Sequence, residues 1–311
     1  MGDDTARPRI LLVTPEISLV PDRSREHFDY LNCKPVGFAG FLSDWAGDLH
    51  ARGVDVHIVQ PDYRRAFTSI LRNSPRIKGC RMPTDNVHLT EDRAFFYAGH
   101  PEANTPRENI KISLAFQREV IHQILPALKP DLIHCHDWMC GLIPAVARNL
   151  GIPCIFSLQN CETAKCFLSD VEDSGIDAAF FWQQLFFDHF PGNYEQIRET
   201  NAIDFLLSGV LAARHVSIAS PAVLLKIAES FIRFPEAPLG KVLSEKLAVD
   251  CNAATEVRSA GMQFVNLYER LLGRPLLKTG AKSKFRNESW QHPILKDLRP
   301  LSFQENLEVR A

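Results

Sequence analysis

The amino-acid sequence predicts a doubly wound α/β fold built on one parallel sheet. Short apolar runs such as "RILLV" (9–13) and "DLIHC" (131–135) do not alternate with polar residues, which is typical of strands buried on both faces. Amphipathic helical patterns at 38–53 and 110–129 lie between such runs. Strands that alternate with helices along a chain favour a parallel sheet covered by helices on both faces.

Further strands and helices are expected along the same rhythm. Strands are expected at 54–60, 153–158 and 215–220, and a helix over 138–151 follows the strand 131–135 at once. The stretch "RIKGCRMPTDNVHLTEDRAFFYAGH" breaks this rhythm, because "TDN" and "TEDR" separate short β-like runs. We expect it to form hairpins off the sheet.

The C-terminal half follows a weaker pattern. The Phe- and Trp-rich stretch 161–200 is expected to form helices over a cleft, and its aromatic residues are more typical of a core than of a ligand platform. A helix at 254–273 is expected to end at Gly273. In order, we expect a main domain at 1–230, a helical extension at 231–277 that packs on it, and a polar tail at 278–311.

Composition excludes several classes of function. The chain has 311 residues, is 45% hydrophobic and 23% charged, and carries a formal net charge of −2. It therefore predicts a globular protein without the positive field that holds nucleic acid. No apolar run approaches the roughly 18–20 residues that a membrane span needs, and the acidic N-terminus does not resemble a secretory signal. The expected location is the cytoplasm.

The cysteine pattern predicts neither disulfides nor a metal site. None of the eight cysteines forms a CxxC pair, and Cys33, Cys135, Cys154 and Cys166 lie among apolar neighbours, as buried free thiols do. In "HCH" the cysteine of the strand would face away from the two histidines. No second cluster at zinc spacing exists, so no metal and no cofactor are predicted.

Candidate site residues follow the strands at their carboxyl ends, where open α/β sheets bind ligands. "HCHDW" places His136, Asp137 and Trp138 at the end of one strand, and Asp137 is suited to cap the next helix. Capping explains Asp137 without catalysis, but it does not explain the histidines and the tryptophan. Gln159 and Asn160 end the next strand.

A phosphate-binding loop is a further possibility near the N-terminus. Lys34 and Gly37 precede the helix 38–53, whose unpaired N–H groups could face an anion. An ordinary strand–loop–helix connection with a surface lysine explains the same residues.

The order and spacing of these motifs resemble the N-terminal domain of glycogen and starch synthases, which are retaining glucosyltransferases of the GT-B class. "KPDLIHCHDWMCGLIPA" is similar to the family's P-D-I-I-H-C-H-D-W segment, and "CKPVGFAGFLSDW" follows its K-x-G-G-L loop. "IPCIFSLQN" and "IDFLLSGVLAARHVSIASP" are similar to two further family segments, so the resemblance covers roughly 9–230. It implies a single Rossmann-like domain equivalent to the N-terminal half of a GT-B enzyme.

The resemblance also implies substrates and roles. The substrates would be ADP-glucose, or a related sugar nucleotide, and an α-glucan such as glycogen. The residues implied at the reacting centre are Asp137, His136, Asn160 and Gln159, and those implied in substrate binding are Lys34, Gly37, Tyr97 and Trp138.

Departures from the family pattern point toward a weakened enzyme. Val36 replaces a loop glycine, Gln159 replaces a histidine, and Leu207 replaces a lysine. Family synthases hold the donor on a second domain with two glutamates eight positions apart, and that spacing is absent here. We therefore expect a chain without the donor domain, weak or inactive alone, which a partner chain could complete.

Three hypotheses remain open from the sequence. The chain could be a glucosyltransferase domain that adds α-1,4-linked glucose to a glucan. It could be a non-catalytic glucan-binding or regulatory subunit derived from a glycogen synthase. It could also bind an unrelated nucleotide or sugar on the same fold, because fold alone does not decide function.

Overall fold

A parallel sheet forms the centre of the molecule in the computed structural model, which describes residues 7–16, 18–21, 30–32, 38–73, 81–98, 104–233, 238–245, 249–251 and 257–276. Within these residues the main sheet has 7 strands in the order β12-β11-β8-β7-β1-β4-β6, and every neighbouring pair is parallel. The strands are β1 (Arg9–Val13), β4 (Asp55–Pro61), β6 (Val87–Thr90), β7 (Leu132–His136), β8 (Cys154–Leu158), β11 (His215–Ile218) and β12 (Val249–Cys251). The predicted α/β fold class is confirmed.

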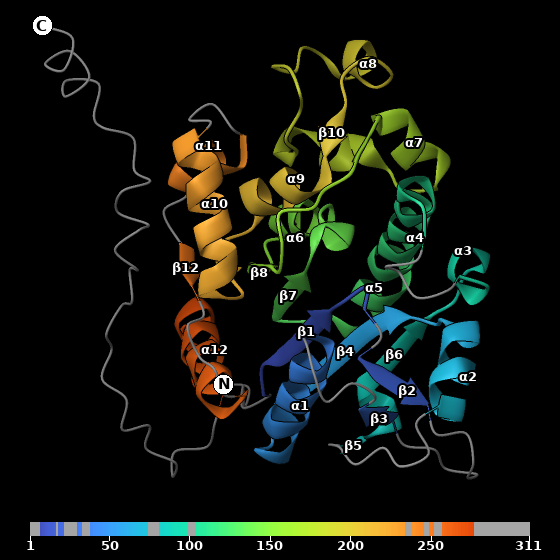
Figure 1. Ribbon diagram of the computed structural model, residues 1–311, viewed down its shortest axis with the longest axis vertical. Helices are drawn as coiled ribbons and strands as arrows, with labels where there is room; N and C mark the ends of the chain where they lie inside the picture. The colour runs from blue at the N-terminus through green and yellow to red at the C-terminus, as the bar shows by residue number, and fades with distance from the viewer. Residues whose placement is uncertain are drawn as a thin grey trace, which may run out of the picture.

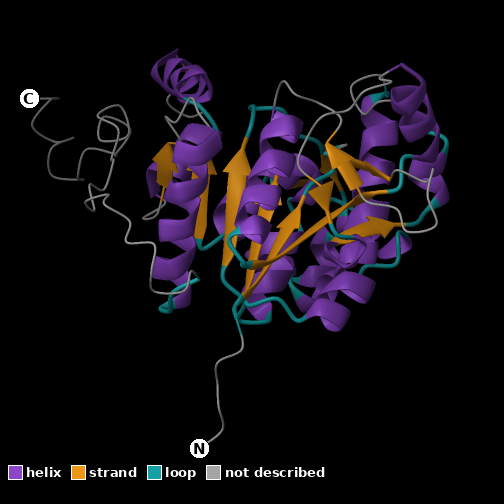
Figure 2. Ribbon diagram, turned by 90° about the horizontal axis from the view of Figure 1, so that it is seen from below, coloured by secondary structure: helices purple, strands orange, loops and turns teal. Residues whose placement is uncertain are grey.

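Helices cover both faces of this sheet (Figures 1 and 2). Helices α1 (Phe38–Ala51) and α12 (Val257–Leu272) pack together on one face, where Trp45 and Tyr268 are fully buried. The other face is covered by α4 (Pro106–Glu119), the π-helical turn η3 (Val120–Ile124), α5 (Leu125–Leu128), α6 (Ile143–Asn149) and α9 (Phe205–Ala212).

Smaller elements surround this core. The described chain adds two small antiparallel sheets, β2 (Leu19–Pro21) with β3 (Tyr30–Asn32) and β5 (Arg81–Met82), and β9 (Lys165–Cys166) with β10 (Ile203–Asp204). The other helices and helical turns are α2 (Arg64–Asn73), η1 (Thr84–Asn86), α3 (Arg93–Phe96), η4 (Trp138–Cys140), α7 (Leu168–Asp173), η5 (Ala178–Phe180), η6 (Trp182–Gln184), α8 (Tyr194–Ile197), α10 (Pro221–Arg233) and α11 (Pro238–Glu245).

The strand order reverses direction between β1 and β7. The chain runs outward from β1 through β4 to β6, then returns to β7 on the other side of β1. The loops after β1 and β7 therefore diverge to opposite faces at their carboxyl ends, which is where ligands bind in open α/β sheets. Thr14 follows β1 and Asp137 follows β7 at this point.

Three sequence expectations need correction. The described part of the segment 76–100, residues 81–98, does not form the expected hairpins, because β5 pairs with β3 and β6 pairs in parallel with β4 inside the main sheet. The helix expected over 138–151 is divided into η4 and α6, since the turn at Gly141 interrupts it. The stretch 231–277, expected to be a helical extension, also contributes strand β12 to the main sheet.

Close helix packing explains the interruption at Gly141. A Cβ on Gly141 would lie 2.0 Å from the backbone oxygen of Phe205, at the start of α9. Gly209, one turn further along α9, lies against the ring of Phe156 in β8, where a Cβ would be 2.5 Å from the nearest ring atom. The two glycines therefore allow α9 to approach both the turn after β7 and the sheet.

Candidate functional site

Asp137 has a backbone conformation that L-residues rarely adopt. Its φ is 72° and its ψ is 163°, a region that is almost entirely restricted to glycine. The strain costs about 1–3 kcal/mol and persists only where the surroundings impose it. Three hydrogen bonds hold Asp137 here: its N–H donates to Ser157 O at 3.1 Å, its carboxylate accepts from Trp138 N at 2.5 Å, and its backbone oxygen accepts from Cys140 N at 3.1 Å.

Burial makes the Asp137 carboxyl hard to ionise. Loss of solvent raises its pKa to about 7, while the bond from Trp138 N acts in the opposite direction. Negative charge on Glu16, after β1, and on Glu162, after β8, raises the pKa further. A carboxyl that titrates near neutral pH can accept or donate a hydrogen bond to a bound hydroxyl group.

The turn after Asp137 is fixed by polar residues of α4. Ser113 Oγ donates to Met139 O at 2.9 Å, and Gln117 Oε1 accepts from Leu142 N at 2.7 Å. Gln117 Nε2 in turn donates to Ser113 Oγ at 3.0 Å, and both side chains are fully buried. Sequence reasoning missed these residues. Their signal was a pair of polar side chains four positions apart within an otherwise apolar helix face.

Trp138 packs behind the turn. Its ring is buried and lies 5.9 Å from the ring of Phe205 in α9, measured between centroids. It therefore stabilises the turn that presents Asp137, and its predicted part in substrate binding stays a prediction.

The two histidines of "HCH" lie under the site. His134 and His136 are fully buried on the face covered by α12, with ring centroids 4.2 Å apart, whereas Cys135 belongs to the core on the opposite face. Burial lowers the pKa of His136 to about 3, so its imidazole is neutral at physiological pH. A proton-transfer role for His136 would need a change in this environment.

Gln159 and Asn160 continue from β8 beside Asp137. The register pairs His136 with Ser157, so Gln159 leaves the sheet next to the Asp137 turn. Asn160 Oδ1 accepts from Glu162 N at 2.8 Å, which fixes the local turn. Gln159 Nε2 is buried and has no hydrogen-bond partner among the residues that the structure describes. A buried amide donor without a partner costs about 1–3 kcal/mol, and a bound oxygen atom would satisfy it.

The remaining predicted binding residues are Lys34, Gly37 and Tyr97, of which the structure describes Tyr97 alone. Lys34 and Gly37, together with Val36 and Cys33, lie outside the described residues. Tyr97 follows α3 beyond the edge strand β6, and its side chain is 75% exposed. In the sheet order β6 is separated from β7 by β4 and β1, which corresponds to roughly 14 Å between the two strands.

A cavity lies away from Asp137, and the described residues form neither a metal site nor a membrane-spanning helix. A cavity of about 660 Å³ is lined by η3, α5 and the Phe180–Phe181 pair, and it includes Pro130 and Ile152, which precede strands β7 and β8. It therefore lies toward the opposite end of the sheet. Within the described residues no cluster of three His, Cys, Asp or Glu is placed to hold a metal ion. No helix in that part of the chain is long and apolar enough to cross a bilayer.

Comparison with known proteins identifies the family. Residues 9–244 match the starch synthase catalytic domain. The glycogen synthase of Rhodopirellula baltica is 35% identical over 248 residues, covering 64% of this chain and 46% of that protein. The glycogen synthase of Halalkalibacterium halodurans is 25% identical over 230 residues, covering 63% and 44%. The chain therefore spans about half the length of these curated relatives.

A solved structure agrees on the fold. The catalytic domain of starch synthase IV from Arabidopsis thaliana, bound to ADP and acarbose, superposes with a TM-score of 0.50 at 15% identity, covering 79% of this chain and 52% of that one. The sequence match, the parallel sheet and the position of "HCHDW" at the reversal of strand order agree with one another. This chain belongs to the glycogen and starch synthase family and carries the Rossmann-like α/β sheet of a GT-B glycosyltransferase.

Proposed function

We propose that the chain is the acceptor-side domain of a glucosyltransferase that moves glucose from ADP-glucose to the 4-hydroxyl group of an α-glucan. The strained, half-buried Asp137 with its raised pKa is the observation that carries this proposal. Strained non-glycine residues are costly, so they are concentrated at working sites. The family match supplies the substrate class, since its curated relatives are glycogen synthases.

The polar groups at the carboxyl edge of β7 and β8 suit a sugar. The Asp137 carboxyl can accept a hydrogen bond from a glucan hydroxyl, and Gln159 Nε2 can donate to a sugar oxygen. In the transfer, the bond from the anomeric carbon to the ADP oxygen breaks, a bond to the glucan oxygen forms, and the hydroxyl proton passes to the departing ADP oxygen. Asp137, protonated or ionised near neutral pH, is suited to orient that hydroxyl.

Efficient transfer would need a second set of groups to hold the diphosphate and the departing charge. The described residues build one parallel sheet, and the chain matches less than half of each curated relative above. We therefore propose that the domain acts weakly alone and that a donor domain, in the remainder of a longer protein or in a partner chain, completes the site.

Glucan binding without catalysis is the second candidate. It is favoured by Gln159, which stands where the family has a histidine, and by the neutral, buried state of His136. A subunit of this kind would hold glycogen through Asp137 and Gln159 while another protein transfers glucose.

One experiment separates the two candidates. Purified chain is incubated with radiolabelled ADP-glucose and glycogen, and label in polymer is counted alongside co-sedimentation of the protein with glycogen. Even weak incorporation above the protein-free background, abolished by Asp137→Ala, supports the transferase, whereas sedimentation with no incorporation above that background supports the binding subunit. If neither occurs, glucan is not the ligand and both candidates fail. Glu91→Ala is a matched control, because Glu91 is exposed beside β6, at the far edge of the sheet.

A further inference from the structure

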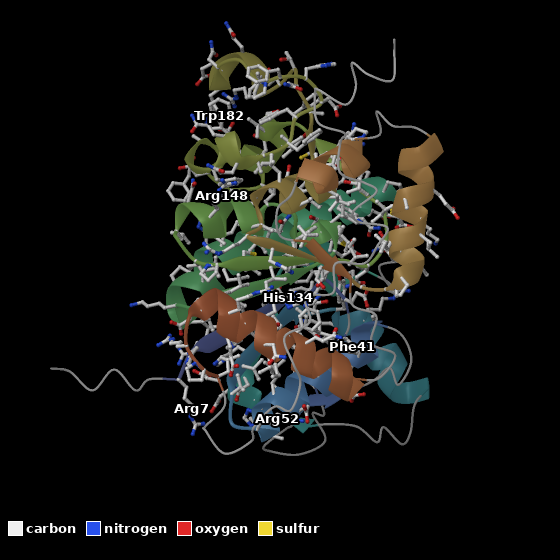
Figure 3. All side chains as sticks on the ribbon, turned by 90° about the vertical axis from the view of Figure 1, so that its left-hand side faces the viewer. Arg7, Phe41, Arg52, His134, Arg148 and Trp182 are labelled. Carbon is white, nitrogen blue, oxygen red and sulfur yellow. The ribbon has the colours of Figure 1, made fainter. Side chains whose placement is uncertain are left out.

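Helix α12 reaches the sheet through a buried hydrogen-bonded chain. Tyr268 Oη lies 2.6 Å from Nδ1 of His134, and Nε2 of the same ring lies 2.7 Å from Ser157 Oγ. All three side chains are buried, and they come from α12, β7 and β8. Figure 3 shows His134 beside α12, toward the middle of the molecule. The chain therefore joins a C-terminal helix to two central strands.

The same strands hold Asp137. Ser157 uses its side chain for His134 and its backbone oxygen for the Asp137 N–H. The ring of His134 also lies against that of His136, the residue before Asp137, with 31° between the ring planes. A shift of the Tyr268 side chain would therefore affect Asp137 through two sets of contacts, one along β7 through His134 and the other through Ser157 in β8.

The hydrogen bonds favour one tautomer of His134. Burial lowers the pKa of His134 well below its ordinary value, so the ring is neutral and has one donor and one acceptor nitrogen. Burial also raises the pKa of Tyr268, which therefore keeps its hydroxyl proton. That proton is directed to the nearest acceptor, Nδ1, which leaves the ring proton on Nε2 to be donated to Ser157 Oγ.

We propose that Tyr268 is a positioning residue for the candidate site: it holds His134 as the Nε2–H tautomer, and His134 and Ser157 together keep Asp137 in its strained conformation. Helix α12 is then part of the machinery that presents the carboxyl. The glucan-binding consequence rests on the proposed function. The structural part does not, because it concerns groups within this chain.

The test compares Tyr268→Phe with Phe264→Leu. Phe264 is on the same helix and contacts the rings of Trp45 and His134, but it donates no side-chain hydrogen bond. For each variant, nitrogen-15 NMR reports the His134 tautomer, carbon-13 NMR follows the titration of the Asp137 carboxyl, and co-sedimentation with glycogen reports binding. Urea unfolding measures the loss of stability in both.

Tyr268→Phe is expected to change the tautomer signature of His134, to move the Asp137 titration midpoint by about half a pH unit or more, and to weaken glycogen binding about three- to tenfold. Phe264→Leu is expected to lose stability but to keep the tautomer and the midpoint. An unchanged tautomer or midpoint in Tyr268→Phe would overturn the proposal and leave Tyr268 a packing residue. If wild-type chain does not bind glycogen, the proposed function fails, and the two NMR measurements still decide the positioning role.

Discussion

Replacement of Asp137 by glycine should relieve the backbone strain that replacement by alanine keeps, while both remove the carboxyl and the function. The φ of 72° and ψ of 163° cost a residue with a Cβ about 1–3 kcal/mol, and glycine does not incur that cost. Glycine loses more conformational entropy on folding, by about 0.5–1 kcal/mol relative to alanine. Strain relief therefore exceeds the entropy loss over most of this range.

Asp137→Ala is the matched comparison. Both variants lose the carboxyl and its bond to Trp138 N, but alanine keeps the strained Cβ. We expect Asp137→Gly to be more stable than Asp137→Ala by about 1–2 kcal/mol. At a position with ordinary dihedral angles the order is the opposite, since alanine is usually favoured over glycine by about 0.4–1 kcal/mol.

Urea unfolding at fixed pH measures the difference directly, and glycogen co-sedimentation should show reduced binding in both variants. An alanine variant as stable as the glycine variant, or more stable, would show that Asp137 is not strained. In that case the main structural support for the proposed site would be lost.

Three further predictions follow from the packing and charge around the site. Because the folded pKa of Asp137 is about 7 and its ordinary value is 3.8, its favourable contribution is complete below pH 4 and is lost as the pH rises through 7. Unfolding titrations of Asp137→Asn should therefore lack about 2–4 kcal/mol of the wild-type loss over this interval, and parallel curves would show that the carboxyl titrates normally. Gly141→Ala should destabilise the fold by more than about 3 kcal/mol, because the new Cβ would meet a backbone oxygen. Gly209→Ala should cost about 1–3 kcal/mol, because the new Cβ would meet a ring that can shift. Thermal unfolding measures which variant is less stable, and the reverse order would contradict the packing of α9. Gln117→Ala should cost about 1–3 kcal/mol by leaving Leu142 N unpaired and should weaken glycogen binding, while a stable variant with full binding would exclude Gln117 from support of the turn.

The sequence determined most of the strand layout because buried parallel strands have a strong local signature. The runs at 9–13 and 131–135 coincide with β1 and β7 to within one residue, since uninterrupted apolar residues have few other uses in a globular protein. Gly273 was identified as the end of the last helix for a local reason too, as its φ of 67° suits glycine.

The sequence also located Asp137, but for an incomplete reason. It was expected to cap an α-helix, and it caps only the short turn η4, which ends at Gly141, where α9 approaches too closely for a side chain. The strain at Asp137 has no signature in the residues next to it. It depends on Ser157 in β8 and on the turn that Ser113 and Gln117 hold from α4.

Short-range patterns thus determined the α/β class, the central strands and the "HCHDW" motif, since each depends on neighbouring residues only. Tertiary structure decided that β6 belongs to the main sheet and that Tyr268 contacts His134. Those outcomes depend on contacts between residues far apart in the chain. These contacts contribute free energy only when the elements pack together, so the periodicity and composition of the sequence do not predict them.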